Sequence, residues 1–306
     1  MTRSTQRRRV QRVRSTSNGE LRVEARADTL VGEEPLEIRL NGQAFAVTMR
    51  TPGHDFALAA GFLLSEGVIT RHAQILRMDY RSGINSDGLR DYNVVDVQLE
   101  PELAARAEPG RREVYTSSSC GVCGTASMDG VLKVSPYEPL QDPLTVELPT
   151  ILGLPEALRA QQRLFTATGG VHAAALFRMA PAQTPQDDDA TAPAVVPHQV
   201  PELLCAREDV GRHNAVDKVV GWALENNLLP LTGTVLQVSA RASFELVQKA
   251  VMAGIPVLSA VSAPSALAVD VADRTGLTLV GFNRGTGANI YAGAQRIDLD
   301  GSRITV

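Results

Sequence analysis

Two cysteines separated by two residues are the clearest candidates for chemistry in this chain. Cys120 and Cys123 lie within Ser-Ser-Ser-Cys-Gly-Val-Cys-Gly, residues 117–124. Glycine destabilises helix and strand interiors, and serine side chains compete with the backbone for hydrogen bonds, so this composition predicts an exposed loop. A thiol in such a loop can accept or donate sulfur, because the thiolate is the reactive form and access controls the rate. The motif indicates thiol chemistry but leaves its kind open.

Two other interpretations of the cysteine pair are weaker. A structural zinc site needs four Cys or His ligands, and the third cysteine, Cys205, has no potential ligand beside it at the usual spacing. We therefore predict no metal site. A thioredoxin-type site places its cysteines at a helix start just after the first strand of a βαβ unit. Here the pair lies about a third of the way along the chain, so redox exchange is the less favoured alternative.

Length and composition describe an ordinary globular protein. The 306 residues are 44% apolar and 21% charged, enough for one large domain or two lobes. No apolar run approaches the roughly 18 residues of a membrane span, so we expect no membrane segment. Three cysteines, two of them in a reactive-looking loop, suit a reducing compartment better than a disulfide-bonded secreted fold. We expect a cytoplasmic protein.

Charge is unevenly distributed. Residues 1–14 hold six arginines and no acid, so the formal net charge of -4 leaves -10 on the remainder. An acidic remainder argues against nucleic-acid binding, because nucleic-acid-binding domains are normally basic. No apolar segment follows the arginines, which excludes a secretory or twin-arginine signal. We interpret residues 1–19 as a disordered, solvated tail, with contact to an acidic partner as the minor alternative.

Residues 20–112 predict a small N-terminal α+β lobe. Alternating apolar residues indicate strands near 21–24, 36–40, 44–48 and 93–99. Asn41-Gly42 is a strong hairpin turn signal. Thr51-Pro52 is expected to open a helix, with threonine as N-cap, and Gly67 to close it.

Residues 113–306 predict an α/β lobe. Strands near 234–239, 256–261 and 277–281 alternate with helices near 242–253 and 265–276. Short connections in this order imply a parallel sheet with right-handed crossovers. Residues 181–201 contain three consecutive aspartates among Pro, Ala, Thr and Gln, a composition typical of a mobile insertion.

The ends of these three strands are the expected ligand site. Parallel sheets bind ligands beyond the carboxyl ends of their strands, where helix N-termini offer free N–H groups to anions. Small and hydroxyl residues follow each strand, and two of the three ends contain an arginine that suits phosphate. The alternative is that these serines only cap helices. No Walker A or G-x-G-x-x-G fingerprint is present. The candidate binding residues are Arg241, Ser243, Phe282, Asn283, Arg284, Gly285, Thr286 and Gly287.

Residues 208–218 form the densest polar cluster. Asp209, His213 and Asp217 fall on the edge of the apolar stripe of a predicted helix, so they should be partly buried. A structural His–Asp network is the alternative to ligand binding, because buried polar groups usually have partners. We include Asp209, Arg212 and His213 as candidates. His172, which follows a glycine turn, is a further candidate for the same cleft.

Taken together, these segments resemble the FdhD/NarQ family of formate dehydrogenase accessory sulfurtransferases. The matching segments run in the family's order over about residues 20–298. They are Thr51-Pro52 with residues 61–67, then residues 120–124, 168–175, 208–218, 241–249 and 277–282.

The resemblance implies a fold similar to cytidine deaminases: an α/β protein with a parallel or mixed sheet, covering helices and a smaller N-terminal α+β lobe. It implies a sulfurtransferase that receives persulfide sulfur from a cysteine desulfurase. The acceptor would be Mo-bis(molybdopterin guanine dinucleotide), destined for the catalytic subunit of a formate dehydrogenase. Cys120 would carry the persulfide, Cys123 would assist, and residues 282–287 would contact the cofactor. The family often has proline where this chain has Gly285.

Two rival functions can be compared with this one. A chaperone that binds the molybdenum cofactor without transferring sulfur is the main alternative. A deaminase would need H-x-E and P-C-x-x-C, but Ala173-Ala174 follow His172 and Ser119 precedes Cys120. That function is excluded. The sequence does not decide whether the chain forms a homodimer.

Overall fold

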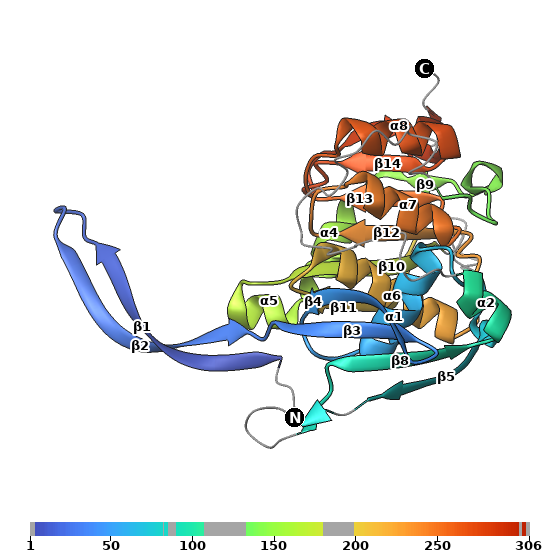
Figure 1. Cartoon of the computed structure of the whole chain (residues 1–306). Helices are drawn as coiled ribbons and strands as arrows, with labels where there is room; N and C mark the ends of the chain where they lie inside the picture. Colours follow the sequence, from blue (N-terminus) through green and yellow to red (C-terminus); the bar gives the residue numbers. More distant parts are fainter. Residues whose placement is uncertain are drawn as a thin grey trace, which may run out of the picture.

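A computed structural model describes residues 4–81, 83–84, 90–106, 133–179, 199–299 and 302–303. Cys120 and Cys123 lie outside the described residues, as do residues 181–198 of the expected insertion. The described chain is a mixed α/β protein from which a long hairpin projects (Figure 1). The finer similarity to cytidine deaminases stays a prediction.

The main sheet has six strands in the order β11-β10-β12-β13-β14-β15. The predicted parallel strands are confirmed as β12 (Thr234–Val238), β13 (Val257–Ala260) and β14 (Thr278–Gly281). The antiparallel members are β10 (His172–Met179), β11 (Pro201–Asp209) and β15 (Asn289–Ala292). The sheet is therefore mixed.

Helices cover both faces of this sheet because its strands are apolar on both. Alternate residues point to opposite faces. Leu236, Leu258 and Leu279 join the core under α6 (Arg212–Glu225), α7 (Phe244–Met252) and α8 (Ala266–Thr275). Val235, Val257 and Val280 join a second core beneath α4 (Leu148–Gln161). The short helix α5 (Arg163–Thr168) follows α4.

The N-terminal part forms a four-stranded sheet in the order β4-β3-β8-β5. Its strands are β3 (Glu34–Leu40), β4 (Gln43–Arg50), β5 (Ile75–Tyr80) and β8 (Val94–Leu99). The predicted Asn41-Gly42 turn is confirmed, with φ values of 48° and 84°. Its buried residues belong to the same core as those of α6 and α7.

Helix α1 (Asp55–Ser65) joins the two parts by packing on α6 through two glycines. A Cβ at Gly61 would lie 1.9 Å from the carbonyl oxygen of Asp217. A Cβ at Gly221 would lie 1.8 Å from the carbonyl oxygen of Ala57. Only glycine at both positions allows this approach of the two backbones.

The expected start of this helix is wrong, whereas its expected end is confirmed. The helix begins at Asp55, after His54 in the left-handed region (φ 56°). Thr51 does not cap it, because its Oγ1 accepts a hydrogen bond from the Val210 N–H at 3.0 Å. Gly67, with φ 73°, closes the helix and donates to the Leu64 carbonyl.

The expected disordered tail is also wrong. Residues Thr5–Ser15 form β1, which pairs in antiparallel register with β2 (Leu21–Val31). The arginines of β1 are not isolated, because β2 pairs with them along its length. In the structure Arg8 lies opposite Asp28 and Arg12 opposite Glu24, which offsets part of the repulsion. We call the β1–β2 hairpin the arm.

The remaining elements are short. They are η1 (His72–Gln74), β6 (Gly83–Ile84), β7 (Arg90–Asp91), α2 (Pro101–Arg106), η2 (Pro139–Gln141), β9 (Val146–Glu147), η3 (Ala294–Arg296), β16 (Ile297–Leu299) and β17 (Ser302–Arg303). Within the described ranges, no helix has the length and apolar character needed to span a membrane.

Candidate functional site

A pocket of about 740 Å³ lies at the carboxyl ends of the parallel strands. Ser239 follows β12, Val261 follows β13, and Asn283 to Gly285 follow β14; all line it. The opposite wall comes from α4, α5 and the turn before β10. We call this the strand-end pocket. The sequence analysis predicted that these three strand ends lie together, and the structure confirms it. That they bind a ligand stays a prediction.

Asn283 holds the loop after β14 in place. Its side chain is fully buried, and its Nδ2 donates to the Ile151 carbonyl at 2.6 Å and to Ser259 Oγ at 3.0 Å. Phe282, just before it, adopts a left-handed φ of 52°. Asn283 thus anchors the loop whose residues 284–287 are exposed. It also lines the pocket, so its contact with a ligand stays a prediction.

Two arginines line the pocket from different elements. The Arg284 guanidinium carbon lies 5.5 Å from the centre of the Phe282 ring, and that of Arg159 lies 4.4 Å from the Phe165 ring. Stacking on an aromatic face restrains a long side chain while its N–H groups stay available. Sequence reasoning missed Arg159, because no motif marks it. It reaches the pocket because α4 packs on the sheet.

His172 lines the same pocket as the first residue of β10. Burial lowers its pKa below the ordinary value, and positive charge on Arg212 and His213 acts in the same direction. A neutral imidazole is therefore expected at pH 7, able to donate one hydrogen bond and accept another. Ser239 is also available: its Oγ accepts from the Ala173 N–H at 2.9 Å and keeps its own proton.

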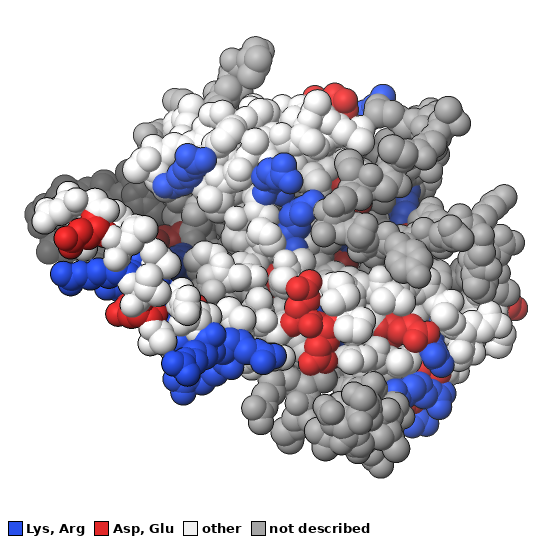
Figure 2. All heavy atoms as spheres, turned by 60° about the vertical axis from the view of Figure 1, so that its left-hand side comes forward, with Lys and Arg blue, Asp and Glu red and all other residues white. Residues whose placement is uncertain are grey.

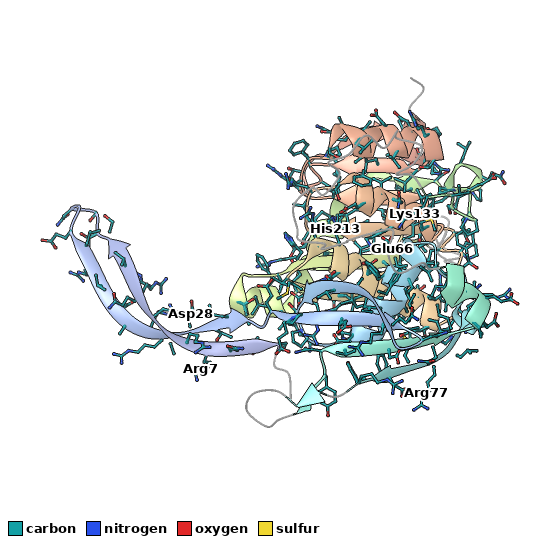
Figure 3. The ribbon with its side chains drawn as sticks, in the orientation of Figure 1. Arg7, Asp28, Glu66, Arg77, Lys133 and His213 are labelled. Carbon is teal, nitrogen blue, oxygen red and sulfur yellow. The ribbon has the colours of Figure 1, made fainter. Side chains whose placement is uncertain are left out.

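Other candidates lie outside the lining of this pocket. His213, labelled in Figure 3, has its Nε2 2.9 Å from Glu245 Oε2 and 3.2 Å from Ser243 Oγ. These three side chains therefore contact one another. The hydrogen bond from His213 lowers the pKa of Glu245. The candidates that do not line the pocket are Asp209, Arg212, His213, Arg241, Ser243, Phe282, Thr286 and Gly287.

Asp209 belongs to a buried network and does not face the pocket. It is fully buried, with Oδ2 2.6 Å from Lys218 Nζ and 3.1 Å from the Thr51 N–H. Its Oδ1 accepts from Gly211 N–H at 2.8 Å. Nearby, Lys249 Nζ lies 2.7 Å from Asp217 Oδ1. We call these two pairs, Asp209–Lys218 and Asp217–Lys249, the buried network; its geometry supports the structural interpretation.

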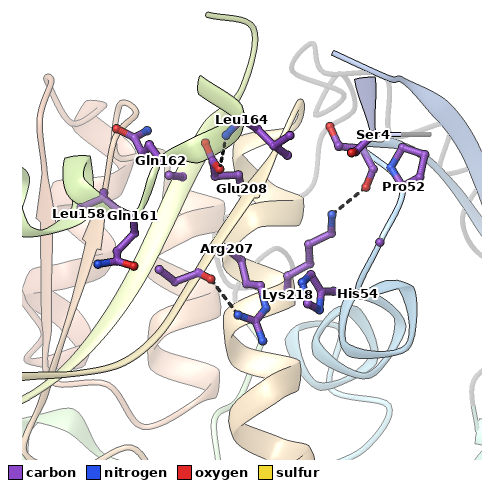
Figure 4. A pocket seen from close by; sticks show the side chains of 14 residues that line it. Ser4, Pro52, His54, Leu158, Gln161, Gln162, Leu164, Arg207, Glu208 and Lys218 are labelled. Atoms are coloured by element: carbon purple, nitrogen blue, oxygen red, sulfur yellow. Dashed lines mark hydrogen bonds between the residues drawn. The ribbon is translucent and has the colours of Figure 1, made fainter. Parts of the chain in front are cut away.

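A smaller cavity of about 270 Å³ lies next to the strand-end pocket (Figure 4). Leu158 and Gln162 line both. Two charged groups of the smaller cavity have internal partners, whereas the buried Nε of Arg207 has none. Lys218 donates to the Thr51 carbonyl at 2.8 Å, and the two Glu208 oxygens accept the N–H groups of Leu164 and Phe165. The strand-end pocket is the larger of the two and is lined by two arginines, so it is the better ligand site.

Cys205 is not a reactive thiol. It is 5% exposed, and burial raises its pKa to about 11. Thiolate is then scarce at neutral pH. Within the described residues, no group of three His, Cys, Asp or Glu side chains could hold a metal ion. Any thiol chemistry of this chain falls to Cys120 and Cys123.

Comparison with known proteins gives a consistent result. The model of the FdhD/NarQ family matches residues 31–298. The sulfur carrier protein FdhD of Streptomyces coelicolor is 54% identical over 301 residues, 98% of each chain. The protein of the same name from Mycobacterium tuberculosis is 51% identical over 275 residues, 89% of this chain and 92% of the other.

A solved structure shows a similar fold. The crystal structure of a formate dehydrogenase accessory protein from Desulfotalea psychrophila matches with a TM-score of 0.63 and 21% identity. The match covers 95% of this chain and 99% of the other. At this identity the likeness concerns the fold alone.

Proposed function

The chain belongs to the FdhD/NarQ family, and from this premise we propose that it is a sulfur carrier that serves a formate dehydrogenase. The names of its close relatives support the sulfur-carrier role. The observation that carries the proposal is the strand-end pocket, which combines a nucleotide-sized volume with two stacked arginines.

In the proposed transfer, sulfur moves from a cysteine desulfurase to Cys120. The Cys120 thiolate attacks the outer sulfur of the donor persulfide, and a new S–S bond forms as the donor S–S bond breaks. The donor cysteine leaves as a thiolate, so the exchange needs no added oxidant or reductant. Cys123 assists from three residues away. This step rests on the sequence motif and the family, and makes the chain a sulfurtransferase.

The proposed cargo is Mo-bis(molybdopterin guanine dinucleotide), which would receive the sulfur before passing to the catalytic subunit of a formate dehydrogenase. A pocket of about 740 Å³ falls within the usual range for small-molecule sites. It suits one nucleotide portion of this cargo. Arg159 and Arg284 would pair with its phosphates, while His172 and Ser239 would supply hydrogen bonds.

Mass spectrometry of the tryptic peptide with Cys120 and Cys123 tests the proposal. After incubation with a cysteine desulfurase and cysteine, we expect one added sulfur atom that reductant removes. Cys120→Ala should lose it. Cys205→Ala is the matched control and should keep it, because that thiol is buried. An unmodified peptide on a protein that still binds the guanine-dinucleotide cofactor would contradict sulfur transfer and favour the chaperone.

A further inference from the structure

The smaller cavity beside the strand-end pocket contains an arginine that no described carboxylate neutralises. Arg207 lines this cavity from β11. Its Nη1 donates to the Ala206 carbonyl at 2.8 Å, and its buried Nε has no hydrogen-bond partner among the described residues. Within the same residues, no carboxylate forms an ion pair with it. A buried donor without a partner requires an explanation, and a bound ion is one.

The other charged groups near Arg207 are not available to it. Lys218 lies 2.6 Å from Asp209 and is paired with it. Both oxygens of Glu208 accept backbone N–H groups of α5, each at 2.8 Å. The carboxylate of Glu225 is influenced by the charge of Arg207, but the two form no ion pair in the described chain. A single negative charge in the cavity would therefore balance the guanidinium.

His54 also indicates a positive potential in this cavity. It precedes α1 and lines the cavity with Arg207 and Lys218, and the three are labelled close together in Figure 4. Burial lowers the pKa of His54 most, and the charges of Arg207 and Lys218 lower it further, whereas Asp55 acts in the opposite direction. No side chain caps α1, so the partial positive charge of the helix N-terminus adds to this potential.

Partial burial makes these charges more effective than charges at the surface. On the face in Figure 2, lysine and arginine side chains stand open to solvent, where water and salt screen them. In the cavity, Lys218 is 1% exposed and Arg207 is partly buried. Opposite charges attract more strongly where the effective dielectric constant is lower. The cavity therefore favours an anion.

Size and geometry select the kind of anion. A volume of about 270 Å³ lies below the usual range for small-molecule sites, so the occupant is smaller than a nucleotide. A guanidinium presents a planar fork of N–H donors that matches the two oxygens of a carboxylate. With Nη1 bonded to the Ala206 carbonyl, Nε and Nη2 form the remaining edge of Arg207. One unbalanced cation suits a monoanion better than a doubly charged phosphate.

We propose that the smaller cavity binds a small monocarboxylate, of the size of formate or acetate, through Arg207 and beside His54. The occupant would lie next to the strand-end pocket, because Gln162 lines both spaces and accepts a hydrogen bond from Arg159 at 3.5 Å. This site is separate from the proposed cargo site, and the inference does not depend on sulfur transfer.

Nuclear magnetic resonance of the full chain, titrated with sodium formate or sodium acetate, tests the proposal. The imidazole resonance of His54, assigned with the variant His54→Gln, should shift saturably at millimolar carboxylate. The pKa of His54 should rise, because a nearby negative charge favours the protonated ring. Arg207→Gln should weaken binding about tenfold or more, as for a lost hydrogen bond to a charged group. Arg178→Gln, on an exposed arginine of the neighbouring strand, is the matched control and should bind as the wild type does.

A second variant guards against misfolding. Arg207→Lys keeps the charge but loses the planar fork, so its affinity should lie between those of the wild type and Arg207→Gln. Far-UV circular dichroism should show both variants folded.

Three results would overturn the proposal. The first is no saturable shift with either carboxylate. The second is an equal shift with sodium chloride at the same ionic strength, which would be a general salt effect. The third is binding that survives in Arg207→Gln and is lost in Arg284→Gln, which would place the carboxylate in the strand-end pocket.

Discussion

The buried network and the strand-end pocket are both rich in charged side chains, but they use them differently. In the network each charge faces a partner: Lys218 lies 2.6 Å from Asp209, and Lys249 lies 2.7 Å from Asp217. In the pocket Arg159 and Arg284 stack on aromatic rings and keep free donors. The densest polar stretch of the sequence therefore pairs α6 with β11 and α7, whereas the arginines that face the pocket come from other stretches.

The largest expected effect comes from breaking the network. Lys218→Met leaves the fully buried Asp209 carboxylate without its cation and should lower the free energy of unfolding by about 3–5 kcal/mol. Urea unfolding measures this loss. The control is Arg178→Met, which removes an exposed pair with Glu202 and should cost less than about 1 kcal/mol. Equal losses in both variants would contradict the distinction.

The glycine contact between α1 and α6 is the next test. Gly61→Ala places a Cβ against the Asp217 backbone and should destabilise the protein by about 3 kcal/mol. Gly153→Ala in α4 is a matched helical control, because no atom lies within 4 Å of the new Cβ. It should be neutral or stabilising, by up to about 1 kcal/mol. Urea unfolding of both variants checks the contrast.

Asn283 is a buried polar residue within the pocket region, and its hydrogen bonds position an exposed loop. Asn283→Ala leaves the Ile151 carbonyl without its donor and should cost about 1–3 kcal/mol. It should also weaken nucleotide binding, since residues 284–287 lose their anchor. Asn289→Ala, on an exposed residue, should change neither. Calorimetric unfolding and a binding titration give the two readings; unchanged binding in Asn283→Ala would refute the anchoring role.

A smaller effect concerns pH. Because the folded pKa of His172 lies below its ordinary value of 6.5, the folded state binds fewer protons. Stability is then fully present above pH 6.5 and is lost as pH falls toward the folded pKa. His172→Gln should reduce this loss, and so should His54→Gln, whose pKa burial also lowers. Unfolding midpoints between pH 7 and pH 5.5 measure the slopes; unchanged slopes would contradict the assignment.

Local patterns predicted the parts of the fold that local chemistry determines. The Asn41-Gly42 turn requires two positive φ values, and the run of short apolar segments after residue 233 requires parallel strands. Thr51 does not cap the helix, because its hydroxyl accepts a hydrogen bond from the N–H of Val210, 159 residues further along the chain. The prediction of a disordered tail was wrong because β1 forms by pairing with β2, and a pairing between two strands is not visible in residues 1–19 alone.

The candidate site was predictable only in part. The strand ends could be found because parallel strands present their carboxyl ends at one edge. Arg159 could not, because only packing of α4 on the sheet brings it there. The internal partners of Asp209 and Asn283 could not be predicted either, since sequence does not show which distant groups a buried polar side chain meets.

Calorimetric titration with guanosine diphosphate tests most directly whether the strand-end pocket is the cargo site. We expect the wild type to bind, and Arg159→Gln and Arg284→Gln each to weaken binding about tenfold or more, as for a lost hydrogen bond to a charged group. Arg178→Gln, on an exposed arginine outside the pocket, should bind as the wild type does. A wild type that does not bind, or pocket variants that bind unchanged, would contradict the account.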